Sequence, residues 1–171
     1  MKIFVEMRKI MDNWKFAIDM ELDGEKYYTE QANINKDNGL NVVCLMLAED
    51  EKKHAQILTD KMNEKSFQLI ESETLSKAKN IFEGSNDIKI ENKEIPSQLD
   101  FYRIATEKEK QSIDLYKEYL VKATETAEKE LFQYLIKQEE HHYEVLDNIA
   151  SLLIKPEEWV ENAEFGIRKE Y

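Results

Sequence analysis

The chain has 171 residues, of which 42 % are hydrophobic, and this is enough apolar material for one domain with a real core. Its four glycines and two prolines are too few for the many turns of a β-sandwich or barrel, so the composition favours long helices. A formal net charge of −12 would repel phosphate backbones and anionic lipid surfaces. We therefore expect an all-α protein with no nucleic acid or membrane partner.

Cysteine content and the amino-terminal sequence bear on where the protein works. Cys44 is the only cysteine, so neither an intrachain disulfide nor a four-cysteine metal site can form. Cys44 is predicted to pack as a small apolar group. The apolar run at the amino terminus is too short for a signal peptide, and no stretch approaches the ~20 apolar residues of a membrane span. These features favour a cytoplasmic protein.

The first half of the chain has the pattern of a helical hairpin. Apolar residues recur at helical spacing over residues 13–34 and again over residues 40–67, and Asn and Gly residues between the two runs have turn chemistry. A short helix is expected over residues 72–82, within a crossover that spans residues 68–96 and ends in a loop.

The second half repeats this organisation. A third helix is predicted from the N-cap Ser97 to about Lys122, and a fourth helix ends near Ile154, because Pro156 disfavours its continuation. A short terminal helix is expected to open at this proline, in the tail of residues 155–171.

Two hairpins, residues 13–67 and 97–154, joined by one long connection match the ferritin-like, antiparallel four-helix bundle. We expect a single domain of this kind over residues 1–171, with a long central crossover and a short C-terminal helix. A coiled coil is the structural alternative, but charged residues interrupt its heptad pattern.

A spacing repeat marks the residues that carry chemistry. The motif Glu-x-x-His occurs twice, 88 residues apart, and a lone glutamate precedes each copy by 30 residues. Because these spacings recur without drift, each hairpin contributes the same three residues. The six residues are Glu21, Glu51, His54, Glu109, Glu139 and His142.

All six residues lie on the apolar stripes of their helices. Residues three apart on a helix are neighbours, so each motif presents a carboxylate and an imidazole to one point in the interior. Burying four carboxylates without compensation would cost several kcal/mol per ion, and two divalent cations supply the missing positive charge. Mixed oxygen and nitrogen donors suit Fe or Mn better than tetrahedral Zn. The sequence predicts a site for two such ions, with terminal and bridging carboxylates and open positions for dioxygen or peroxide.

Other residues near these stripes have more than one interpretation. Gly24 and Ser112, one turn from the lone glutamates, are predicted to leave space for the oxidant. The core aromatics Tyr28 and Tyr116 are candidates for a hydrogen bond or a radical-quenching role beside the metals, and Tyr27 is an alternative.

Polar residues beside the motifs also leave alternatives open. Asp50 and Gln138 precede the motif glutamates, and either side chain could accept the free imidazole N–H of a histidine or simply pack as a polar group. His141 points about 100° away from His142 around the helix and is predicted to be solvated. In the tail, Trp159 and Phe165 are expected to cover a bundle end or a subunit contact.

The pattern resembles the rubrerythrin-like branch of the ferritin-like di-iron proteins, over roughly residues 13–154. The stretches that carry the resemblance are residues 20–28, 48–55, 107–112 and 138–143. The resemblance implies that the six residues are the family's shared ligands to two Fe ions, with Mn as an alternative. It also implies that a diferrous centre is oxidised by hydrogen peroxide or dioxygen.

The chain departs from that family in two ways. Rubrerythrins carry an additional glutamate three residues after the ligand of the third helix, where this chain has Ser112. They also carry a rubredoxin module with four iron-binding cysteines, for which Cys44 alone cannot substitute. We therefore expect a separate electron donor, such as a rubredoxin-like protein, and a homodimer or higher homo-oligomer.

Three functions remain open on these grounds. The first is a di-iron oxidoreductase that removes peroxide or dioxygen under oxidative stress, with the metal ions as its catalytic group. The second is an iron or manganese binding and storage protein without efficient turnover. The third is a helical interaction module with a vestigial site.

Overall fold

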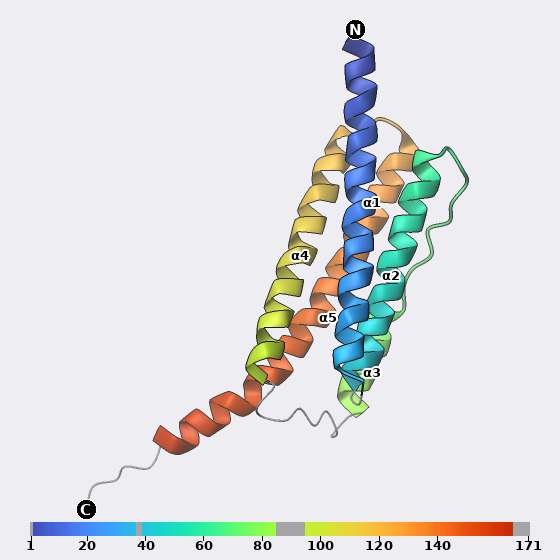
Figure 1. Ribbon diagram of the computed structural model, residues 1–171. Helices are drawn as coiled ribbons and strands as arrows, with labels where there is room; N and C mark the ends of the chain where they lie inside the picture. Colours follow the sequence, from blue (N-terminus) through green and yellow to red (C-terminus); the bar gives the residue numbers. More distant parts are fainter. Residues whose placement is uncertain (1, 37–38, 85–94, 166–171) are drawn as a thin grey trace, which may run out of the picture.

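The computed structural model describes the backbone of residues 2–36, 39–84 and 95–165, and the side chains of residues 11–36, 39–81 and 100–151. Five helices make up its regular structure (Figure 1), and the expected all-α, ferritin-like bundle is confirmed. The helices are α1 Lys2–Ile34, α2 Gly39–Met62, α3 Thr74–Gly84, α4 Ile95–Lys122 and α5 Thr126–Phe165.

The bundle consists of two hairpins. Helix α1 packs against α2, and α4 packs against α5, while the short α3 lies against α5 and α2. After α2, residues 63–73 run without regular structure along the outside of the bundle to α3 (Figure 1). We call this segment the strap. Because it returns the chain to the end where α2 began, α4 starts at the same end of the bundle as α2.

Helix α2 ends at Met62, five residues before the predicted limit. Glu64 has a φ of 55°, in the left-handed region that stops a helix. The backbone N–H of Lys65 donates to the carbonyl of Asp60 at 2.8 Å, and the N–H of Glu64 donates to that of Lys61 at 3.1 Å. This is the hydrogen-bond pattern of a Schellman C-cap.

Helices α1, α4 and α5 also differ from the predicted limits. Helix α1 begins at Lys2, and α4 begins at Ile95, so Pro96 lies in the first turn, where its missing N–H costs nothing. Helix α5 continues through Pro156 to Phe165, and the predicted separate terminal helix is wrong. A proline inside a helix can be accommodated by a bend, and the red part of α5 turns away from the bundle (Figure 1).

The buried apolar residues form two clusters. One contains Leu47, Tyr102 and Leu146, and the other contains Leu58, Tyr116 and Leu135. The six residues singled out by the spacing repeat lie between these clusters along the helices. Two apolar layers therefore exclude water from the middle of the bundle.

Within the described part of the chain, no helix combines the length and the apolar character that crossing a lipid bilayer requires.

Candidate metal centre

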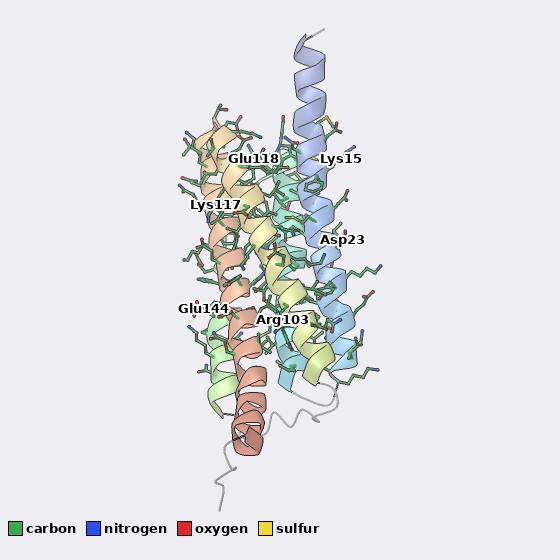
Figure 2. All side chains as sticks on the ribbon, turned by 90° about the vertical axis from the view of Figure 1, so that its left-hand side faces the viewer. Lys15, Asp23, Arg103, Lys117, Glu118 and Glu144 are labelled. Carbon is green, nitrogen blue, oxygen red and sulfur yellow. The ribbon has the colours of Figure 1, made fainter. Side chains whose placement is uncertain are left out.

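The six predicted residues converge in the middle of the bundle, and each of them is at most 4 % exposed. They come from all four long helices. By contrast, the charged residues labelled in Figure 2, such as Lys15 and Glu144, lie on the outer surface. The buried residues are Glu21 from α1, Glu51 and His54 from α2, Glu109 from α4, and Glu139 and His142 from α5.

The six residues form two overlapping groups. In each group, one ligand atom from every residue lies within 4.8 Å of the others. Glu51 and Glu139 belong to both groups, so the glutamates of the two Glu-x-x-His motifs are placed to bridge. The first group adds Glu21 and His54, and the second adds Glu109 and His142.

The imidazoles face the shared carboxylates through Nδ1. Nδ1 of His54 lies 3.0 Å from Oε1 of Glu139, and Nδ1 of His142 lies 3.1 Å from Oε1 of Glu51. The two rings stack with centroids 5.5 Å apart and planes inclined by 21°. Each histidine therefore reaches across the bundle to the glutamate of the other hairpin.

Two buried tyrosines fix the terminal glutamates. The hydroxyl of Tyr28 donates to Oε1 of Glu109, and the hydroxyl of Tyr116 donates to Oε1 of Glu21. Each bond joins α1 to α4, and the two tyrosines are related by the same 88-residue repeat. Burial and the neighbouring carboxylates raise the pKa of both phenols well above 10, so both stay neutral donors.

Burial and mutual repulsion disfavour full ionisation of the four glutamates. Burial and the adjacent carboxylates raise the pKa of Glu51 and of Glu139 well above 4.5. Burial also acts to raise the pKa of Glu21 and of Glu109, but hydrogen bonds to them, including those from the histidines, outweigh it and lower both values. So many carboxylates in a dry interior require compensation by protons or by cations.

The donor set fits two divalent ions. Bonds of about 2 Å to a first-row metal place opposite ligands about 4 Å apart, and in each group the ligand atoms lie within 4.8 Å of one another. Oε1 of Glu139 is fully buried and has no hydrogen-bond partner among the described residues, although Nδ1 of His54 lies nearby. A cation between them would satisfy this oxygen.

Asp50 lies behind His142, but Nε2 of His142 has no hydrogen-bond partner among the described residues, so acceptance of the imidazole N–H by Asp50 stays a prediction. Its Oδ2 is 3.6 Å from Nε2 of His142 and accepts hydrogen bonds from the hydroxyls of Ser72 and Thr74. Its Oδ1 is 3.5 Å from the exposed Nζ of Lys53. Burial acts to raise the pKa of Asp50, but His142 and the two hydroxyls hold it below 3.8.

Gln138 does not occupy the corresponding place behind His54. Its Oε1 accepts from the backbone N–H of Ser72 at 3.2 Å, and its Nε2 donates to Glu71 at 3.0 Å. The edge-on ring of Tyr134, with its centroid 6.2 Å away, packs against His54. Gln138 therefore ties the strap to α5.

A cavity of about 220 Å³ lies beside the cluster, between α1 and α4. Gly24 and Ser112, the two small residues predicted to leave space, line it together with Glu51 and Glu109. A Cβ atom at Gly24 would lie 3.1 Å from Cδ of Glu51, so a larger residue there would displace this glutamate. The opposite, α2 and α5 side is covered by the strap.

The remaining candidates lie outside the two groups. Cys44 is buried, and burial raises its pKa to about 12, as expected of a packing residue. His141 is half-buried, where the sequence predicted solvation. The half-buried Tyr27 donates to the carbonyl of Phe101 at 3.3 Å. The side chains of Trp159 and Phe165 lie outside the described residues.

The sequence did not reveal Ser72 and Thr74 as partners of Asp50. They belong to the strap and to the start of α3, and only the folded chain brings them to α2. The place of Glu51 and Glu139 in the cluster did have a signal, because these glutamates share a helix face with a histidine.

The family model described as Rubrerythrin matches residues 12–150. This range contains all six residues of the cluster and most of both hairpins. Comparison with curated proteins and with solved structures produced no match.

Proposed function

The chain belongs to the rubrerythrin family, and from this premise we propose that it is a di-iron oxidoreductase that reduces hydrogen peroxide or dioxygen. The observation that carries the proposal is the pair of four-residue groups that share Glu51 and Glu139. Two buried groups with two common carboxylates are suited to two ions held side by side.

Each residue has a role in this proposal. Glu21 and His54 would hold one ion, Glu109 and His142 the other, and the two shared glutamates would bridge them. The tyrosines that donate to the terminal glutamates fix the orientation of these carboxylates before an ion binds, and such preorganisation strengthens binding.

The cavity between α1 and α4 gives a small oxidant a way to the cluster. Two ferrous ions bound there would supply the two electrons that, together with two protons from solvent, reduce hydrogen peroxide to two water molecules. Gly24 and Ser112 keep this side open, while the strap and the apolar layers exclude water elsewhere. A separate protein donor would return the electrons, and manganese is the alternative metal.

Anaerobic loading with Fe(II), followed by rapid mixing with peroxide or dioxygen, tests this function. We expect close to two Fe per chain and a fast oxidation of both ions. His142→Ala should lose bound iron and the fast reaction, whereas His141→Ala, a change at the adjacent histidine outside both groups, should keep them. Two bound ions that are oxidised once and then retained would favour storage over turnover. Less than one Fe per chain would contradict the proposal.

A further inference from the structure

The 88-residue repeat makes the two halves of the cluster nearly equivalent. Each half has one terminal glutamate that accepts a tyrosine hydroxyl, one histidine that faces inward through Nδ1, and the same two shared glutamates. We call the halves the Glu21–His54 position and the Glu109–His142 position. The nearest groups are therefore of the same chemical kind at both positions.

The halves differ in what lies behind each imidazole. Behind His142 is Asp50, whose Oδ2 is 3.6 Å from Nε2, just beyond hydrogen-bond distance, and this buried Nε2 has no hydrogen-bond partner among the described residues. The repeat places Gln138 at the matching point of the other half, but its amide is bonded to the strap. Among the described residues, His54 approaches carboxylates only through Nδ1. Only one of the two histidines therefore has a carboxylate on its outer side.

The placement of Asp50 is fixed by the fold. The oxygen that faces His142 also accepts the hydroxyls of Ser72 and Thr74, from a segment more than twenty residues further along the chain. Asp50 is 3 % exposed, so solvent screens its charge weakly on that side. Its contact with Lys53 is on the other oxygen and involves an exposed ammonium group, which makes that pairing weak.

A carboxylate behind a metal-binding histidine holds the ring in one orientation and one tautomer and makes the ligating nitrogen more basic. Removal of such a partner typically costs about 10- to 100-fold in metal affinity. We propose that the two metal positions are unequal, with the Glu109–His142 position filled first because Asp50, held by the strap, positions His142. This inference rests on the proposed function, since it concerns the order in which the same two ions bind.

Anaerobic titration with Co(II) alone, followed by visible absorption and calorimetry, tests the inequality. The wild-type chain should take up two ions in two steps. Repulsion between two bound ions would make the second ion bind more weakly even if the two positions had the same intrinsic affinity. Variants are therefore needed to assign each binding step to a position. Glu109→Gln should remove the tighter step, and Glu21→Gln should remove the weaker one.

The role of Asp50 is tested by an isosteric change. Asp50→Asn should weaken the tighter step about 10- to 100-fold and leave the weaker step within about threefold. Gln138→Ala, at the repeat-related position, should leave both steps within about threefold. Far-ultraviolet circular dichroism of each metal-free variant checks that it is folded.

Three outcomes would overturn this inference. They are a single concerted step in the wild type, a tighter step that survives Glu109→Gln but not Glu21→Gln, and equal weakening of both steps by Asp50→Asn. The first two would leave two bound ions and hence the proposed function intact. Uptake of fewer than two Co(II) by the wild type would overturn the proposed function itself.

Discussion

Replacement of Glu139 by leucine should stabilise the metal-free protein while abolishing metal binding. Glu139 is 1 % exposed, and its pKa is raised by burial and by neighbouring carboxylates. Its Oε1 lies 3.0 Å from Nδ1 of His54 but has no hydrogen-bond partner among the described residues. A buried polar group without a partner costs about 1–3 kcal/mol. Leucine has a similar volume and removes that cost, so the free energy of unfolding should rise by about this amount.

Thermal unfolding in the presence of a chelator measures this effect. For a chain of this size, about 1 kcal/mol corresponds to roughly 2–4 °C in Tm, so Glu139→Leu should raise the Tm of the metal-free protein by several degrees. Without the chelator, Fe(II) or Mn(II) should raise the Tm of the wild type but not that of the variant, because a ligand stabilises only the state that binds it.

Glu140→Leu is the matched control, because Glu140 is the next residue of α5 and is exposed. Its change should alter the free energy of unfolding by no more than about 0.5 kcal/mol and leave metal binding unchanged. A lower Tm for metal-free Glu139→Leu than for the wild type would refute the reasoning, since it would mean that the carboxylate stabilises the bundle without an ion.

Three further predictions concern the same cluster. The pKa values of Glu51 and Glu139 are raised above 4.5 in the folded state, so the metal-free folded protein binds protons that the unfolded chain releases. The free energy of unfolding should therefore fall as the pH rises from 5 to 8. Denaturant unfolding with a chelator measures this slope, and a free energy of unfolding that rises with pH would contradict the prediction. Gly24→Ala places a Cβ 3.1 Å from Cδ of Glu51 and should weaken both metal-binding steps in a Co(II) titration. Unchanged affinities would show that the Glu51 side chain can shift without a loss of metal binding. Tyr116→Phe leaves Oε1 of the buried Glu21 without its donor and should lower metal affinity, and an unaltered binding isotherm would assign this tyrosine to packing alone.

Much of the site could be predicted from the sequence because the spacing of residues along a helix determines which face of the helix their side chains share. The 88-residue repeat places Glu21 and Glu109 on equivalent stripes, and the three-residue spacing within each motif places a carboxylate beside an imidazole. The structure brings all six residues together in the interior. Four helices with a long middle connection were predictable for the same reason.

The connection itself could not be predicted in detail. The strap begins inside the segment whose apolar spacing predicted a helix to residue 67, because α2 ends where Glu64 adopts a left-handed conformation that no sequence pattern indicates. The contacts of Ser72 and Thr74 with Asp50 join distant segments, so no local pattern reports them. The stop expected at Pro156 failed because a proline inside a helix can be accommodated by a bend.

The most direct test of the central claim is anomalous scattering at the iron edge from crystals of the chain loaded anaerobically with Fe(II). The account predicts two peaks within the bundle, one between Glu21 and His54 and one between Glu109 and His142, with Glu51 and Glu139 in contact with both. A single peak within the bundle, or iron bound only at the acidic surface, would contradict it.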